Sequence, residues 1–263
     1  MGGEAAIIPT GPDGEMLVRR DITHKAACYL AALSEIFPSI GPELVLDLGA
    51  SDCTSALTVA AAWSGVRVVA WECSPERVIA GMTALRAAGA VGSRVSLVPA
   101  AAMERSGLES FWPVRENAEA GSRFRPSGGY DSIERYSTAD TPLSVFGLRV
   151  RDWAEREHVR AIDAAWLDLQ GGELGALTGF GPELLGTVQV VQAEVCYRSI
   201  YADAPLWPDV RAWMEAAGFV LVVRSEMLGG HWGDALWCRP AQLEGGGVRR
   251  AVAAALEGLP ERP

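Results

Sequence analysis

Short apolar runs alternate with Ala-rich or amphipathic stretches along most of this sequence. Residues 44–48, 66–71 and 94–98 are runs of the length of a buried strand, and helical stretches begin between them near Thr54 and Pro75. Repeated strand–helix–strand units of this kind predict a largely parallel sheet with helices on both faces. The expected fold class is therefore α/β.

The second half of the chain continues this pattern. Strands are predicted at 164–169 and 188–195, helices at 173–177 and 207–217, and an antiparallel pair at 219–224 and 234–239 around the Gly229–Gly230 turn. We expect the antiparallel pair to close the sheet.

The domain organisation follows from where this pattern starts and stops. We expect an N-terminal helical cap over residues 1–40, a main domain over 41–240 with an insertion at 100–142, and a C-terminal tail helix over 241–263. The cap helix is predicted at 21–36, with Asp21 or Thr23 near its start, and is expected to cover the pocket or the sheet edge. The insertion is rich in Gly, Ser and Arg with isolated aromatics, which is typical of a lid or substrate loop.

Composition and charge narrow the partners and the compartment. Of 263 residues 49% are hydrophobic, and 33 acidic side chains stand against 23 basic ones. This acidic balance disfavours nucleic acid and anionic membranes and favours a small-molecule partner. Five scattered cysteines without a C-x-x-C pair predict neither a disulfide framework nor structural zinc. With no apolar run of about 20 residues and no secretion signal, the sequence predicts a cytoplasmic protein and leaves open whether it forms a homo-oligomer.

The first predicted strand ends at a turn suited to a ligand. Gly49 can adopt backbone angles closed to other residues, and Ala50 and Ser51 follow it. The helix near Thr54 begins with unpaired N–H groups that suit a carboxylate or a phosphate. Glu72 ends the second strand, where one carboxylate can accept hydrogen bonds from both hydroxyls of a ribose.

These residues together suit S-adenosylmethionine. Glu72 would bind the ribose, the Gly49 turn the methionine end, and Asp47 would lie near the cationic amino group. The alternative is an ordinary α/β crossover whose glycine only permits the turn. A nicotinamide-dependent oxidoreductase is disfavoured, because Ser51 and Thr54 stand where G-x-G-x-x-G needs its later glycines.

Candidate residues for acid–base chemistry follow the later strands. Asp168 and Glu194 end adjacent strands and would point into the same cleft, where a carboxylate can take the proton of an alcohol. His231, in the loop before the last strand, and His24, on the first helix, are further candidate bases. A structural or solvent-exposed role is the alternative for each of them.

Other side chains are candidates for binding the acceptor or a metal. The aromatic candidates for an acceptor pocket are Tyr197, Tyr201, Trp207 and Trp232. Asp168, Glu173 and Glu194 offer oxygen ligands for a divalent metal, although spacing in sequence does not establish that they converge. Arg123 and Arg125 suit either an anion clamp or an exposed loop.

In its motifs the chain resembles the FkbM-type methyltransferases, over residues 44 to 239. The matching segments are VLDLGAS, VVAWECSPER, WLDLQGGEL, VQAEV followed by Tyr201, and GDALWCR. The resemblance implies a Rossmann-like class I fold, with a seven-stranded, mostly parallel sheet whose last strand is antiparallel. It also implies S-adenosylmethionine bound over the carboxyl ends of the early strands, and methylation of hydroxyl groups on sugars, polyketides or other secondary metabolites.

The sequence departs from the family pattern at several places. Cys53 stands where a glycine is usual, and a cysteine adopts positive φ less readily than glycine. Gln170, expected at the acceptor together with Glu173, stands where Glu is common, and Trp166 stands where Lys is common. The third strand has no carboxylate for the adenine amino group, so backbone atoms around Ala101 are expected to serve, with Cys73 beside the same pocket.

Three functions remain open from the sequence. An O-methyltransferase acting on a small molecule is favoured. The alternatives are an N-methyltransferase of an amino sugar or another small amine, and a noncatalytic protein that binds the cofactor.

Overall fold

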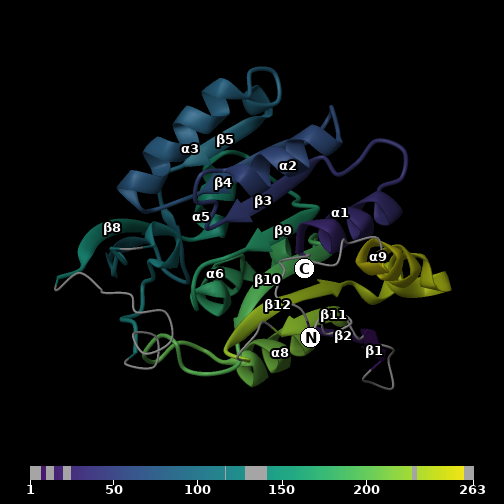
Figure 1. Ribbon diagram of the computed structural model, residues 1–263. Helices are drawn as coiled ribbons and strands as arrows, with labels where there is room; N and C mark the ends of the chain where they lie inside the picture. The colour runs from purple at the N-terminus through teal and green to yellow at the C-terminus, as the bar shows by residue number, and fades with distance from the viewer. Residues whose placement is uncertain are drawn as a thin grey trace, which may run out of the picture.

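One large twisted sheet with helices on both sides forms the body of the protein (Figure 1). The computed structural model describes residues 7–9, 15–19, 25–115, 117–127, 141–226 and 230–257. Within these ranges the sheet has nine strands, in the order β1 (Ile7–Pro9), β2 (Met16–Arg19), β11 (Val220–Glu226), β12 (Trp232–Cys238), β10 (Val190–Cys196), β9 (Ala164–Leu167), β3 (Leu44–Leu48), β4 (Arg67–Trp71) and β5 (Val95–Val98).

The central strands are parallel, as the sequence predicts. Strands β5, β4, β3, β9 and β10 run in one direction, and β12 lies antiparallel between β10 and β11. All five residues of β3 are buried, because helices cover both faces of a parallel sheet. The class I sheet with its antiparallel last strand is therefore confirmed.

The sheet is wider than the seven strands that the sequence analysis expects. β1 and β2 form a hairpin that joins the edge at β11, where β2 pairs in parallel through Val223↔Met16 and its neighbours. Three- and four-residue strands carry too little periodic signal to be recognised beside the Pro- and Gly-rich start of the chain.

The helices divide between two hydrophobic cores, one on each face of the sheet. The first core contains residues of α1 (Lys25–Ile36), α2 (Thr54–Ala62) and α9 (Gly247–Glu257), and α3 (Pro75–Ala87) packs against it through the partly buried Leu85. The second contains residues of α5 (Val150–Arg156), α6 (Glu173–Gly179), α7 (Gly181–Leu185) and α8 (Trp207–Ala216). Alternate residues of β3 enter the two cores: Leu46 packs in the second and Val45 in the first.

The cap helix lies elsewhere than expected. α1 covers the face of the sheet over β10 and β12 and packs against α9, rather than covering the pocket or the sheet edge. The Tyr29 ring of α1 packs edge to face on the Trp166 ring, with the two ring centroids 5.2 Å apart. The predicted cap residues Asp21 and Thr23 lie outside the described residues. The C-terminal tail helix is present as α9, and it buries Val248, Val252 and Leu256.

The insertion contributes two strands to a second, three-stranded sheet. This sheet has the order β6 (Ala101–Ala102), β8 (Leu143–Leu148) and β7 (Gly107–Phe111), and β8 directly follows the insertion. The 3-10 turn η2 (Ala118–Ala120) follows β7 along the chain. Two further 3-10 helices are η1 (Gly92–Arg94) and η3 (Pro240–Gly246). In the described parts of the chain, no helix combines the length and the hydropathy needed to cross a membrane.

Candidate active site

A cavity of about 630 Å³ opens at the carboxyl ends of β3, β4, β9 and β10. This is the size of a small-molecule site, and it lies where parallel α/β sheets bind their ligands. Most of the predicted site residues line it: Gly49, Ala50, Ser51, Thr54, Glu72, Cys73, Ala101, Asp168, Gln170, Glu194 and Tyr201.

The turn after β3 brings two strand ends into close contact. The amides of Gly49 and Ala50 both donate to the carbonyl of Trp71, each at 2.9 Å. Gly49 has φ +85°, and a Cβ on it would lie 1.9 Å from the carbonyl oxygen of Asp168. Only glycine fits, both for its backbone angle and for the room that β9 leaves.

The turn keeps its left-handed geometry although two of its residues are not glycine. Ser51 has φ +49° and Cys53 has φ +65°, so the cysteine adopts the conformation that the family pattern assigns to glycine. Cys53 is fully buried, and its Sγ would lie 2.8 Å from a Cβ on Gly81 of α3. The side chain that strains the turn therefore occupies space that Gly81 leaves open.

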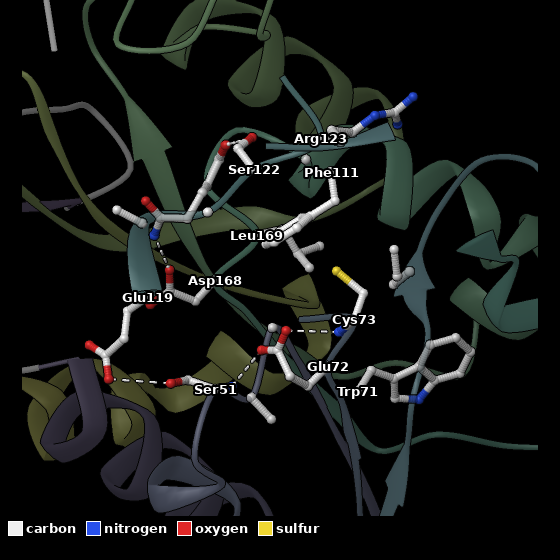
Figure 2. Close-up of a pocket in the computed structure, with 18 of the residues that line it drawn as sticks. Ser51, Trp71, Glu72, Cys73, Phe111, Glu119, Ser122, Arg123, Asp168 and Leu169 are labelled. Atoms are coloured by element: carbon white, nitrogen blue, oxygen red, sulfur yellow. Dashed lines mark hydrogen bonds between the residues drawn. The ribbon is translucent and has the colours of Figure 1, made fainter. Parts of the chain in front are cut away.

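Glu72 is held at the end of β4 by backbone donors. Its Oε2 accepts from the Ser51 amide at 2.9 Å, and its Oε1 accepts from the Cys73 amide at 2.8 Å (Figure 2). Oε1 also accepts from the Ser74 amide at 2.7 Å. Burial raises the pKa of this carboxyl above its ordinary value, while the three N–H donors favour the ionised form. The bonds fix the carboxylate beside the cavity with acceptor capacity remaining on Oε2.

Cys73 also lines the cavity. Burial, together with the neighbouring Glu72 carboxylate, raises the pKa of its thiol to about 12. The thiol is therefore protonated at neutral pH and offers a small apolar surface rather than a nucleophile.

Gln170 joins the two carboxylates on the opposite wall. Its amide nitrogen donates to Asp168 Oδ1 at 2.7 Å and to Glu194 Oε2 at 2.9 Å. Its amide oxygen accepts from the Tyr201 hydroxyl at 2.6 Å. Gln170 has φ +53°, in the left-handed region that residues other than glycine rarely adopt. The three bonds fix the orientation of the amide and hold the two carboxylates on either side of it.

The insertion is fastened to this wall. The Ser122 hydroxyl donates to the Gln170 carbonyl at 2.7 Å, and the Tyr201 hydroxyl lies 3.0 Å from the Ala120 carbonyl. Arg123 donates to both oxygens of Glu104, at 2.5 and 3.0 Å. Arg123 is therefore paired within the protein, which favours a structural role. The guanidinium carbon of Arg125 lies 5.5 Å from the centroid of the Trp112 ring.

Several predicted residues lie outside the cavity lining, and two of them, Asp47 and Glu173, belong to the sheet and to α6. Asp47 is buried on the α1 side of the sheet, where its charge adds to burial in raising the pKa of Tyr29. Glu173 is buried at the start of α6 and accepts from the Leu169 amide at 2.7 Å. Burial raises the pKa of Glu173 to about 7.

Tyr197, Trp207 and His231 also lie outside the lining, in the region around the last strand. The Tyr197 hydroxyl donates to the Ser225 carbonyl at 2.6 Å, and its ring packs 5.9 Å from that of Trp207. His231 contributes its carbonyl, which accepts from the Tyr197 amide at 2.8 Å, whereas the next residue, Trp232, lines the cavity. His24 lies outside the described residues.

The possible metal ligands do not form one group. Asp168 and Glu194 line the cavity, whereas Glu173 is buried beneath it. Over the described ranges of the chain, no group of three or more His, Cys, Asp or Glu side chains is arranged to hold a metal ion.

The insertion supplies site residues that the sequence does not single out. Glu109, Phe111, Glu119 and Ser122 all line the cavity. The composition of the insertion predicts a loop near the ligand, but it does not indicate which side chains face inward. The alternation of Glu109 and Phe111 along β7 is the available signal, and it is too short to be recognised alone.

Comparison with known proteins identifies the family. A family model described as the methyltransferase FkbM domain matches residues 47–221. The chain belongs to the FkbM methyltransferase family. The Gly49 turn and Glu72 line the part of the cavity where the sequence analysis expects a cofactor.

Individual relatives of this FkbM methyltransferase are distant. The 2-O-methyltransferase NoeI of Sinorhizobium fredii is 26% identical over 113 residues, which cover 41% of this chain and 46% of NoeI. The chain thus matches about half the length of that relative. Methyltransferase FkbM of Methylobacillus flagellatus has a TM-score of 0.48 at 14% identity, with 74% of this chain and 43% of that chain covered. An O-methyltransferase of Bacillus cereus, solved with S-adenosylhomocysteine, has a TM-score of 0.48 at 15% identity, with 83% of this chain and 82% of that chain covered.

Proposed function

We propose that this protein methylates a hydroxyl group of a small molecule, such as a sugar, a glycoside or a secondary metabolite. The observation that carries this proposal is the carboxylate pair of Asp168 and Glu194, held at the cavity wall by the Gln170 amide. A hydroxyl acceptor has to lose its proton during transfer, and a carboxylate within hydrogen-bond reach can take it.

The donor end of the cavity fits the cofactor. When bound, S-adenosylmethionine supplies a methyl group on a positively charged sulfur. Glu72 is positioned to accept from the ribose hydroxyls, and Gly49, Ala50 and Ser51 line the cavity beside it, at the proposed place of the methionine end. Backbone atoms around Ala101 and the side chain of Cys73 line the part of the cavity assigned to the adenine.

The acceptor end has separate roles for its side chains. Asp168 receives the proton from the acceptor hydroxyl, and Glu194 orients the acceptor by accepting a hydrogen bond. Gln170 donates to one oxygen of each carboxylate and so fixes the orientation of both side chains. Tyr201, Trp232 and Phe111 give the acceptor an aromatic wall.

A small amine is the second candidate acceptor, because several carboxylates and one arginine line the cavity. The carboxylates are Asp52, Glu72, Glu109, Glu119, Asp168 and Glu194. An amino sugar carries a positive charge that such a lining attracts. Its nitrogen needs to be neutral to accept a methyl group, so N-methylation would be favoured at higher pH.

The test begins with calorimetry of S-adenosylmethionine and S-adenosylhomocysteine, followed by methyl transfer to matched alcohols and amines. Transfer to oxygen of a sugar or glycoside supports the proposal. Transfer only to nitrogen would replace it with the second candidate. Tight cofactor binding without transfer to either class would indicate a noncatalytic binding protein.

A further inference from the structure

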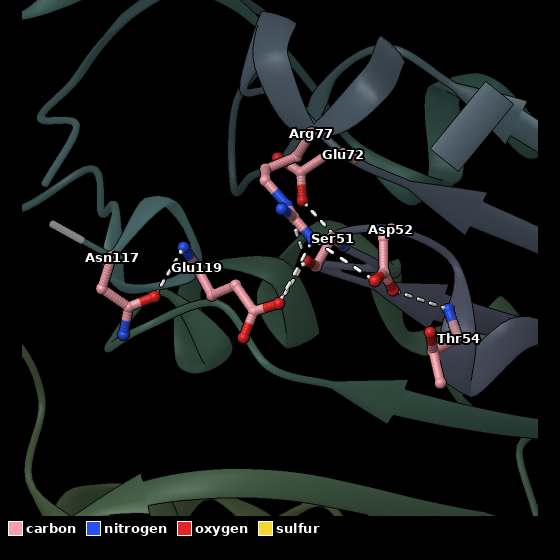
Figure 3. Close-up of polar contacts among 7 residues, drawn as sticks. All are labelled: Ser51, Asp52, Thr54, Glu72, Arg77, Asn117 and Glu119. Atoms are coloured by element: carbon pink, nitrogen blue, oxygen red, sulfur yellow. Dashed lines mark hydrogen bonds and ion pairs between the residues drawn. The ribbon is translucent and has the colours of Figure 1, made fainter. Parts of the chain in front are cut away.

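Arg77 of α3 is the centre of a polar network at the donor end of the cavity (Figure 3). Its Nε donates to the Ser51 hydroxyl at 2.9 Å, and its Nη2 lies 3.2 Å from Glu119 Oε1 and 3.5 Å from Asp52 Oδ2. The Ser51 hydroxyl in turn donates to Glu119 Oε1 at 3.2 Å. The network joins α3, the turn after β3 and the insertion.

Ser51 connects this network to the cofactor site. Its amide donates to Glu72 Oε2 at 2.9 Å, and its hydroxyl contacts both Arg77 and Glu119. Ser51 has φ +49°, an angle that a non-glycine residue keeps only when its surroundings hold it. Arg77 is outside the cavity lining, yet it fixes a residue that fixes Glu72.

Glu119 is the insertion's contribution to the network. It lies in η2, where its amide donates to the Asn117 side chain at 3.1 Å. This bond sets the start of the 3-10 turn and directs the Glu119 carboxylate toward Ser51 and Arg77 (Figure 3). The segment 117–123 therefore spans from the donor turn to the Gln170 wall.

The two ends of this segment are held differently. At the acceptor end, the contacts of Ser122 and Tyr201 are buried, with each residue 1% exposed. At the donor end, the side chains of Glu119 and Asp52 are 61% and 41% exposed. Exposed ion pairs are weak and are screened by salt, so the segment opens most readily at Glu119.

We propose that Arg77 is a positioning residue for the methyl donor and that its contact with Glu119 is a clasp, closing segment 117–123 over the donor end. Release of the donor or of its demethylated product requires the clasp to open, while the Gln170 wall stays assembled. The inference rests on the proposed placement of the donor beside Ser51 and Glu72.

The experiment measures the rate at which S-adenosylhomocysteine leaves the protein, by displacement and tryptophan fluorescence. Trp71 and Trp232 line the cavity and supply the signal. Glu119→Gln and Arg77→Met should each release the ligand about three- to tenfold faster, as expected for one or two exposed charged contacts. Arg77→Lys should restore part of the difference, because it keeps the charge.

Salt and matched variants separate a clasp from a general structural role. At about 1 M salt the Debye length is about 3 Å, so wild type and Glu119→Gln should release the ligand at similar rates. Arg77→Met, which also loses the hydrogen bond to the Ser51 hydroxyl, should keep only part of its difference from wild type. Arg86→Met, on the exposed side of the same helix, should match wild type at every salt concentration. The exchange Arg77→Glu with Glu119→Arg should release the ligand more slowly than either single change.

Each outcome bears on one proposal or the other. If wild type binds neither cofactor form, the donor placement fails, and the proposed function fails with it. If wild type binds but Glu119→Gln and Arg77→Met release the ligand at its rate, the clasp alone is refuted. Faster release in Arg77→Met that neither salt nor Arg77→Lys changes would also refute the clasp and leave only a structural role for the arginine.

Discussion

Replacing Gln170 by glutamate is the sharpest test of the acceptor wall. The change keeps size and shape, and it keeps an oxygen that can accept from Tyr201. It removes the nitrogen that donates to Asp168 and Glu194, and it places a third carboxylate at the positions now joined by bonds of 2.7 and 2.9 Å. The perturbation is therefore electrostatic rather than steric.

The loss of unfolding free energy in Gln170→Glu can be estimated for two cases, with the carboxylates all ionised or with one of them protonated. Two lost hydrogen bonds to charged groups amount to roughly 3–6 kcal/mol if all three carboxylates stay ionised. The cluster can instead bind one proton, and holding a carboxyl of ordinary pKa protonated at pH 7 costs about 3.7 kcal/mol. Proton uptake therefore limits the loss of unfolding free energy to about 3–4 kcal/mol at pH 7 and about 1 kcal/mol near pH 5.

Urea and thermal unfolding of wild type and Gln170→Glu between pH 5 and pH 8 measure this loss directly. The variant gains a carboxyl whose folded-state pKa is raised, so its deficit should be small at low pH and should grow as the pH rises. At pH 7 the melting temperature should fall by roughly 10 °C. Turnover should fall more than cofactor affinity, because the proton held by the cluster blocks the proposed proton acceptor.

The double variant Gln170→Glu with Glu194→Gln is the matched control. It moves the amide to the neighbouring position, so one amide again lies among the carboxylates and most of the lost stability should return. A Gln170→Glu protein that is as stable as wild type at pH 7, with a deficit independent of pH, would refute the account of this wall.

Four further predictions address the rest of the site. Glu72→Ala should weaken cofactor binding by about 1–3 kcal/mol in calorimetry, through loss of charged hydrogen bonds, and an unchanged dissociation constant would remove it from the ribose site. Gly49→Ala should lose both cofactor binding and several degrees of melting temperature, since its Cβ would lie 1.9 Å from the Asp168 carbonyl; a variant with normal stability would contradict that contact. Asp168→Asn should reduce turnover more than cofactor affinity, and equal turnover would exclude it as the proton acceptor. Burial raises the pKa of Glu173 to about 7, so the stability of the folded protein is highest below pH 4.5, and up to about 3 kcal/mol of unfolding free energy is lost as the pH rises to 7. Glu173→Gln should remove this pH dependence in unfolding experiments. A dependence of the unfolding free energy on pH equal to that of wild type would show that the Glu173 carboxyl is not its source.

The sequence predicts best the parts of the fold that are periodic and buried. The runs that become β3 and β4 are apolar over their whole length, because both faces of a parallel sheet are covered. β7 is different: the exposed residues Leu108 and Ser110 alternate with the less exposed Glu109 and Phe111, so polar and apolar residues are mixed on both faces. Its character as a strand depends on pairing with β8.

The same reasoning separates the site residues that the sequence places well from those that it does not. Asp168 follows β9 and Glu194 lies within the adjacent parallel strand β10, and the pairing of Leu167 with Ala193 brings them level. The direction of a side chain in a loop has no such constraint. Their places in the sequence predict Tyr197 and His231 at the acceptor. In the structure the Tyr197 hydroxyl donates to the Ser225 carbonyl, and the His231 carbonyl accepts from the Tyr197 amide.

The cysteine beneath the donor turn has a consequence for how this turn can change over evolution. Its sulfur fills the space left by the missing side chain of Gly81, so the two positions must vary together. With glycine at position 53, the nearest contacts of an alanine Cβ at 81 would be at 3.4 Å or more, whereas in this chain the Cβ would lie 2.8 Å from the Cys53 Sγ. Homologues that carry cysteine in the turn should therefore keep glycine at that point of the neighbouring helix, as a covarying pair.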